Sequence, residues 1–357
     1  NPEGSSVALA VYFHPEHEHN VQRMLDAMKI SLDVFSERFS PFQFQQARIL
    51  EFPAYAGFAQ SFANTVPYSE SIGSIQNFRE EDQDDLIDLV TYVTAHEIAH
   101  QWWAHQLIGA NKQGMTLLSE TFSQYSALLV MEQLYGKPQI RRFLKRELDR
   151  YLRSRGTEAV EELPLSRVED QGYIHYNKGA VAMYGLKEII GEDAVNRALQ
   201  ALLKEFAFKG APYPDTRDFL RLLRAETAGR YEQVIVDLFE KITIYDLAAR
   251  EPVVRELPDG RFETTFVVDA RKHYADGEGN ETEAPLDEEF DVGAFSEEPG
   301  KKAFSADSVL AMTRSALKSG TQTVRLVTEQ RPVYIGVDPY NLRIDRNSDD
   351  NVATVAD

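Results

Sequence analysis

Three things are missing from this sequence of 357 residues. It has no cysteine, so disulfide bonds, thiolate metal sites and cysteine nucleophiles are all excluded. No apolar run approaches the roughly 18–20 residues that cross a bilayer, and the amino terminus has neither an initiator methionine nor a secretion signal. We therefore expect a processed protein or an excised fragment. Any membrane anchor would lie outside this chain, and an extracytoplasmic or membrane-associated location would depend on that missing anchor.

Basic residues are scarce as well. The chain has 38 Lys and Arg against 57 Asp and Glu, which gives a net charge of −19. Such a surface repels phosphate backbones, and the basic run at residues 141–146 has apolar neighbours at helical spacing. We expect this run to be the solvated face of a helix and expect no nucleic-acid partner. The sequence leaves the oligomeric state open.

Two regions of the chain differ in their patterns. In residues 1–250, short extended segments give way to helical ones; for example, apolar residues between Val21 and Phe35 recur at three- and four-residue steps. From residue 251 onward, strand-like segments at 261–270, 323–328 and 332–337 are separated by turn signals. The predicted fold class is α+β, with a catalytic domain at 1–250 followed by a small β-sandwich-like domain at 251–357. The acidic stretch 275–300 is interpreted as a solvated loop or strand edge.

Residues 96–100 carry the strongest chemical signal, His-Glu-Ile-Ala-His within a periodic apolar segment. Histidines four positions apart leave the same face of a helix, and neutral imidazole nitrogens are good ligands for zinc. Glu97 lies one step around the helix, where its carboxylate reaches a water on the metal. The pattern predicts a zinc site built on His96 and His100.

A catalytic zinc usually takes three protein ligands and keeps one position open for water. Glu120, within Leu-Ser-Glu-Thr on the next predicted helix, is the best candidate for the third ligand. Two antiparallel helices joined by residues 104–115 would bring it back to the histidines, whereas Glu132 lies too far along the same helix.

His-Glu-Ile-Ala-His-Gln-Trp-Trp followed by Leu-Ser-Glu-Thr resembles the gluzincin signature of the aminopeptidase N (membrane alanine aminopeptidase) family. That family usually has eighteen residues between the second histidine and the ligand glutamate, whereas nineteen, residues 101–119, intervene here. The resemblance covers about residues 5–250. It implies a thermolysin-like zincin domain with a small sheet part and a helical part, a zinc cofactor and a peptide substrate. The family's amino-terminal saddle-like β domain is not found in this sequence.

A second block, Tyr-Asn-Lys-Gly at 176–179, resembles the family's Y-x-K-G block. The resemblance implies that Tyr176 donates a hydrogen bond to the oxyanion of the tetrahedral intermediate. A phenol suits this role because it can donate to a developing negative charge without being charged itself.

A third block departs from the family pattern. The family's G-x-M-E-N loop binds the free α-amine of the substrate through its glutamate, and the matching stretch 73–77 reads Gly-Ser-Ile-Gln-Asn. The resemblance implies that Gly73, Gln76 and Asn77 bind substrate. Because Gln76 is neutral, the amine contact loses its charge-assisted part, on the order of 1–2 kcal/mol, so amine anchoring is weakened or supplied elsewhere.

The end of the chain, residues 336–340 and 344–346, resembles the β domain of bacterial family members fused to ABC-type permeases. That resemblance implies contact with a membrane only through segments absent from this chain.

The predicted function is zinc-dependent hydrolysis of peptide bonds, of aminopeptidase type, with Glu97 activating the water while zinc and Tyr176 stabilise the oxyanion. Three alternatives stay open: another hydrolase on the same zinc site, such as an epoxide hydrolase; a non-catalytic, zinc-stabilised binding or regulatory domain of a membrane transporter; and a protein with no metal at all. Glu97 and Tyr176 argue against the binding domain, because a closed structural zinc site needs neither.

Overall fold

A computed structural model describes residues 6–73 and 87–356. By its internal contacts the chain divides into two compact units, which are described separately below. The first contains residues 1–134 and 165–235, and the second contains residues 135–164 and 236–357. Within the described residues, no helix is both long and apolar enough to cross a membrane.

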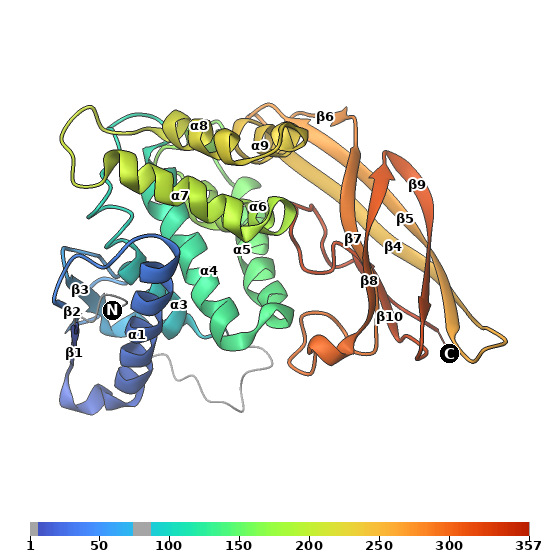
Figure 1. Ribbon diagram of the computed structural model, residues 1–357, viewed down its shortest axis with the longest axis horizontal. Coiled ribbons are helices and arrows are strands. Elements are labelled where there is room, and N and C mark those ends of the chain that lie inside the picture. The colour runs from blue at the N-terminus through green and yellow to red at the C-terminus, as the bar shows by residue number, and fades with distance from the viewer. Residues whose placement is uncertain (1–5, 74–86, 357) are drawn as a thin grey trace. The chain divides into compact units, whose positions relative to one another are not determined.

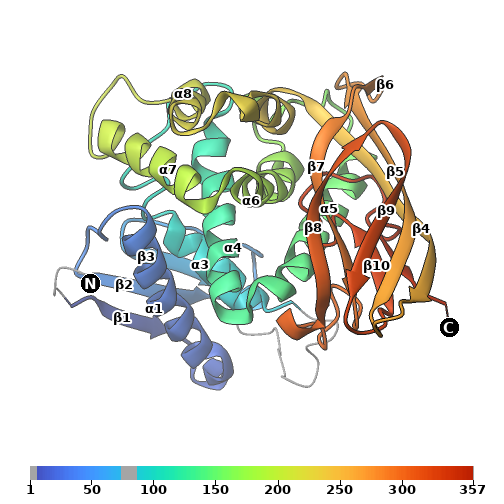
Figure 2. The same ribbon diagram turned by 45° about the vertical axis from the view of Figure 1, so that its right-hand side comes forward.

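The first unit begins with a small parallel sheet whose strands lie in the order β1–β2–β3. The strands are β1 (Ala8–Tyr12), β2 (Gln46–Phe52) and β3 (Thr65–Ser69). The connection from β1 to β2 contains α1 (Val21–Arg38), which lies beside the sheet in both ribbon views (Figures 1 and 2). The residues of α1 with helical spacing, from Met24 to Phe35, are buried as the periodicity predicts.

Helices form the rest of the first unit, with α4 buried along most of its length. Their bounds are α2 (Glu70–Gly73), α3 (Leu89–Ala99), α4 (Phe122–Tyr135), α6 (Gly179–Ile190), α7 (Glu192–Phe206), α8 (Thr216–Glu226) and α9 (Glu232–Ile235). Two π-helical turns, η3 (Leu117–Thr121) and η6 (Tyr173–Lys178), lead directly into α4 and α6. Such turns hold one residue more than an α-helical turn and are frequent at functional sites.

The second unit contains α5 (Ile140–Arg155) and antiparallel strands in two sheets. One sheet has the order β4–β5–β6, with β9 also paired to β5, and the other has the order β11–β10–β7–β8. The strands are β4 (Ile242–Glu256), β5 (Phe262–Ala275), β6 (Glu281–Ala284), β7 (Asp287–Phe295), β8 (Val309–Lys318), β9 (Gly320–Thr328), β10 (Tyr334–Val337) and β11 (Val352–Thr354). Side chains of both sheets share one hydrophobic core.

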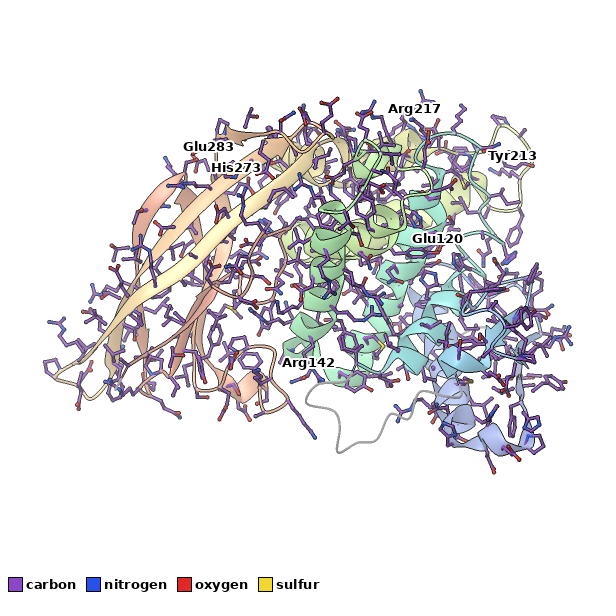
Figure 3. The ribbon with its side chains drawn as sticks, turned by 180° about the vertical axis from the view of Figure 1, so that it is seen from behind. Glu120, Arg142, Tyr213, Arg217, His273 and Glu283 are labelled. Atoms are coloured by element: carbon purple, nitrogen blue, oxygen red, sulfur yellow. The ribbon has the colours of Figure 1, made fainter. Side chains whose placement is uncertain are left out.

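A polar network is buried beside this core. Lys272 of β5 is almost fully buried and donates hydrogen bonds to Asp237 (2.8 Å) and Glu288 (2.7 Å). At the edge of the same sheet, His273 of β5 lies opposite Glu283 of β6 (Figure 3). Burial of a charged amine is tolerated here because two carboxylates compensate it.

The structure confirms the predicted α+β class, with a small sheet and helices followed by antiparallel sheets. The interpretation of residues 275–300 as a loop or strand edge misses one strand. In β7, the buried side chains of Phe290, Val292 and Ala294 alternate with Glu289 and Asp291, so these two acidic residues lie on the opposite face of a core strand, whereas Glu288 lies on the same face as Phe290 and bonds to Lys272. The domain boundary at residue 250 stays a prediction.

Candidate metal centre

Helix α3 carries the two histidines of the predicted zinc site. Its start is fixed by Asp88, whose side chain accepts a hydrogen bond from the Thr91 amide (3.0 Å), a normal N-cap arrangement. At the other end, His96 and His100 are only 7% and 8% exposed. The helix therefore presents two nearly buried imidazoles one turn apart.

Glu120 brings a carboxylate to the same point from η3 (Figure 3). Its Oε2 atom lies 3.3 Å from Nε2 of His96 and 3.3 Å from Nε2 of His100, and the two Nε2 atoms lie 3.1 Å apart. Ligand atoms about 2.0–2.1 Å from a tetrahedral zinc ion are about 3.3 Å from one another. The three side chains therefore fit zinc both in chemistry and in spacing.

The ring orientation of His100 supports this fit. Its Nδ1–H donates to the carbonyl oxygen of Trp103 (3.1 Å), and the hydroxyl of Ser123 lies at the same distance from Nδ1. A proton held on Nδ1 leaves the Nε2 lone pair directed at the cluster, as in most histidines that bind metals. Trp103 itself is fully buried.

The charges at the cluster are strongly coupled. Burial raises the pKa of Glu120, but hydrogen bonds from both imidazoles outweigh it and hold that pKa well below its usual range. Burial lowers the pKa of His100, but the Glu120 carboxylate outweighs it and raises that pKa to about 9. An anionic carboxylate between two imidazoles is an arrangement in which a divalent cation can replace protons.

Glu97 lies on α3 between the two histidines and is almost fully buried. Burial raises its pKa, and the imidazoles of His96 and His100 offset part of that rise. A carboxylate whose pKa is moved toward neutrality is suited both to accept and to return a proton.

Tyr176 reaches the cluster from η6. Its ring centroid is 5.7 Å from that of His96, and the Glu120 carboxylate is close enough to contribute to the raised pKa of its hydroxyl. Burial raises the pKa of this phenol, so it remains a proton donor at ordinary pH. The neighbouring His175, for which the sequence predicted no role, packs against Tyr176 with ring centroids 4.3 Å apart.

Gly179 explains why the Tyr176 segment comes so close to Glu120. A Cβ atom at Gly179 would lie 2.5 Å from Oγ1 and 2.7 Å from Cγ2 of Thr121, the residue after Glu120. The hydroxyl of Thr121 also donates to the backbone oxygen of His175 (2.6 Å). The glycine of the Tyr-Asn-Lys-Gly block thus permits close contact between the two π-helical turns.

A pocket of about 240 Å³ adjoins the cluster and includes His100 and Glu120 in its lining. Gln60 and Ser61 line another part of it, and apolar side chains such as Leu107 complete the wall. The sequence reasoning did not single out Gln60 or Ser61. Both residues belong to segment 58–62, which forms a hairpin with residues 65–69. Asn64 has a positive φ in the turn, and asparagine at this position was the sequence feature that could have indicated the hairpin.

Of the three residues predicted to bind substrate, only Gly73 lies within the described residues. Gly73 ends α2, where a Cβ atom would meet Met24 and Tyr68, and its carbonyl oxygen accepts a hydrogen bond from Asn20 (2.7 Å). Gln76 and Asn77 lie outside the described residues. Their role in binding substrate stays a prediction.

A small sheet next to helices, with two histidines of one helix and a glutamate of the next converging on a point, defines a protein of the zinc metallopeptidase class. The profile of the Peptidase family M1 domain matches residues 23–240, more than half of the chain. The chain belongs to peptidase family M1. Peptidases of this family use zinc, and the histidine–histidine–glutamate cluster is present here.

Curated relatives are similar mainly over this region. Human endoplasmic reticulum aminopeptidase 2 is 25% identical over 218 residues, which cover 59% of this chain and 22% of that protein. Aminopeptidase M1 of Arabidopsis thaliana is 25% identical over 192 residues, covering 52% and 22%. Tricorn protease-interacting factor F2 of Thermoplasma volcanium is 23% identical over 273 residues, covering 73% and 32%. The chain thus spans between about a fifth and a third of the length of these relatives.

Among solved structures, the crystal structure of Legionella pneumophila aminopeptidase A in complex with aspartic acid has the same fold. The TM-score is 0.54 at 14% sequence identity, with 92% of this chain and 35% of that chain covered. The names of the Legionella protein and of the three relatives above do not mention a permease. They give no support to the permease resemblance of the carboxy-terminal segment.

Proposed function

We propose that this chain hydrolyses peptide bonds with zinc bound by His96, His100 and Glu120, in the manner of an aminopeptidase. The observation that carries the proposal is the triangle of ligand atoms 3.1–3.3 Å apart, with Glu97 and Tyr176 beside it. Family membership supports the same chemistry.

When bound, zinc supplies the Lewis acid that acidifies water and polarises a carbonyl group. Glu97 removes a proton from the attacking water and delivers it to the leaving amine, which its buried position and raised pKa favour. Tyr176 donates its hydroxyl proton in a hydrogen bond to the oxyanion that forms on the former carbonyl.

The hairpin segment at 58–62 offers an edge along which a peptide can extend. The amide of Gln60 donates to the Pro67 oxygen (3.1 Å), and Phe62 and Thr65 exchange hydrogen bonds. In an antiparallel pair the backbone groups of alternate residues face the other edge. Here these are the groups of Ala59 and Ser61, of which the Ser61 oxygen already lies 3.3 Å from Nε2 of His105. An extended substrate can pair with such an edge as an added strand.

We therefore add Gln60 and Ser61 to Gly73, Gln76 and Asn77 as proposed substrate-binding residues. Two matched variants, Gln60→Glu and Gln76→Glu, identify where the free amine is read. If the new carboxylate of one variant contacts the substrate amine, we expect that variant to lower KM about tenfold for substrates with a free amine. Its KM for N-acetylated substrates should be unchanged. An unchanged KM in both variants would refute amine recognition at either position.

Zinc analysis together with hydrolysis of aminoacyl anilides tests the function itself. We expect zinc-loaded protein to cleave the anilide, and Glu97→Gln to keep its zinc while losing turnover by about a thousandfold or more. Glu37→Gln, an exposed change on α1, serves as the control and should retain full activity.

Other outcomes favour the alternatives. Zinc binding without turnover of any peptide or epoxide substrate would support a binding domain instead. Turnover of epoxides alone would indicate a different hydrolase, and undiminished activity in Glu97→Gln would rule out the proposed mechanism.

A further inference from the structure

A second group of potential metal ligands exists in the first unit and shares no residue with the first group. His17, Glu51 and Glu70 each offer one ligand atom, and these atoms lie within 4.8 Å of one another. The residues come from three separate elements: the 3₁₀ turn η1 (Pro15–Asn20), strand β2 and helix α2. Within residues 6–73 and 87–356, these are the two groups of histidine and acidic residues with such spacing.

The two carboxylates are held in place before any ion binds. Glu51 accepts a hydrogen bond from the His14 amide through Oε2 (2.6 Å), and Glu70 accepts one from the Ala54 amide through Oε1 (2.8 Å). The other oxygen of each carboxylate approaches Nδ1 of His17: Oε1 of Glu51 is in direct contact, and Oε2 of Glu70 lies 3.9 Å away. One oxygen of each group is thus fixed by the backbone, and the other points to His17.

The backbone around His17 is adapted to this position. His17 has φ −109° and ψ 27°, which interrupts the helical conformation of η1. Three residues later, the buried side chain of Asn20 donates to the Gly73 oxygen at the end of α2 (2.7 Å). This hydrogen bond joins the turn that carries His17 to the helix that carries Glu70.

Charge and access also suit a cation. Two carboxylates and a neutral imidazole sum to −2, which a divalent ion neutralises. The side chains of His17, Glu51 and Glu70 are 25%, 10% and 26% exposed, so an ion can reach them from solvent. A nitrogen ligand favours Zn²⁺ or Mn²⁺ over Ca²⁺ and Mg²⁺, which prefer oxygen ligands only.

We propose that His17, Glu51 and Glu70 form a second binding site, for a divalent transition-metal ion, distinct from the cluster of His96, His100 and Glu120. The competing reading is a protonated His17 held by two carboxylates. The hydrogen bond that Glu51 accepts from His17 raises the pKa of His17, so a proton and a metal ion compete for Nδ1. Measurements at pH 8 favour the metal in that competition.

Equilibrium dialysis against buffered zinc at pH 8, followed by elemental analysis, tests the proposal. We expect about two equivalents of zinc per wild-type chain and about one in His17→Ala. Glu70→Gln changes shape least and keeps an acceptor for the Ala54 amide, so it guards against a folding artefact in His17→Ala. It should weaken the second equivalent at least about tenfold.

Two controls separate this site from other sources of bound zinc. His19→Ala removes an exposed ring in the same segment that is not part of the cluster and should keep both equivalents. His100→Gln disables the cluster of His96, His100 and Glu120 and should keep one equivalent of zinc. The double variant with His17→Ala should bind none. This comparison makes failure of the second site distinguishable from failure of the proposed peptidase site.

A wild-type chain that binds one equivalent, and loses it completely in His100→Gln, would overturn the proposal. So would a second equivalent that depends on His19 rather than on His17 and Glu70, because that would indicate adventitious binding to surface histidines.

Discussion

Replacing Tyr176 with phenylalanine removes one hydroxyl group and tests the oxyanion role directly. The ring keeps its packing against His96 and His175, at centroid distances of 5.7 and 4.3 Å, so we expect the fold and the zinc content to be unchanged. Loss of one oxyanion donor costs about 10²–10³ in kcat, or about 2.7–4 kcal/mol. We therefore expect kcat to fall at least about a hundredfold.

Steady-state hydrolysis of an aminoacyl anilide measures this effect. An interaction made only in the transition state lowers kcat and kcat/KM equally and leaves KM unchanged. The matched control is Tyr173→Phe on the same π-helical turn, where the hydroxyl accepts a long hydrogen bond from Gln171 (3.5 Å). If Tyr176→Phe keeps its zinc and its kcat stays within about threefold of wild type, the oxyanion role is refuted.

Two further changes test the packing that positions the site and the stability of the first unit. Gly179→Ala places a Cβ atom within 2.7 Å of Thr121 atoms, so we expect about 1–3 kcal/mol of destabilisation and a lower kcat. Adding Thr121→Ala should recover part of both losses. No recovery in the double variant would contradict the clash. Asp215→Ala removes the N-cap of α8, and urea unfolding at pH 7 should show a loss of about 1 kcal/mol. Hydrogen bonds from the neighbouring arginine hold the pKa of Asp215 below its usual value, so its contribution is complete above about pH 4 and is lost as the pH falls through the folded-state pKa. An undiminished difference between wild type and variant at pH 2 would contradict this linkage.

The sequence sufficed to predict that His96, His100 and Glu120 converge, because its information there is local. Two histidines one helical turn apart define a ligand pair without any tertiary information, and Glu120 needed only the assumption that the next helix returns. What periodicity did not reveal is the π-helical conformation of the turns that carry Glu120 and Tyr176. A π-helical turn takes up one additional residue, which is compatible with the nineteen-residue spacing between His100 and Glu120.

The pocket wall and part of the second unit were harder to predict. Gln60 and Ser61 belong to a short extended segment that pairs with β3 only through isolated bridges, so no run of alternating residues identifies it. Strand β4 begins at Ile242, two residues after the turn η8 (Val236–Glu240) ends. No glycine or proline lies between them, so the sequence does not mark where the helical turn ends and the strand begins. In β7, apolar residues such as Phe290 and Val292 alternate with acidic ones. This alternation is present in the sequence, but the high number of acidic residues led to the interpretation of the segment as a solvated loop or strand edge.

Anomalous diffraction from crystals of the zinc-loaded chain tests the central claim most directly. The account predicts a zinc peak about 2.0–2.2 Å from Nε2 of His96, Nε2 of His100 and a carboxylate oxygen of Glu120, with a fourth position open to solvent. The absence of a peak at that point in crystals grown with excess zinc, or a peak that one of the three side chains does not contact, would contradict it.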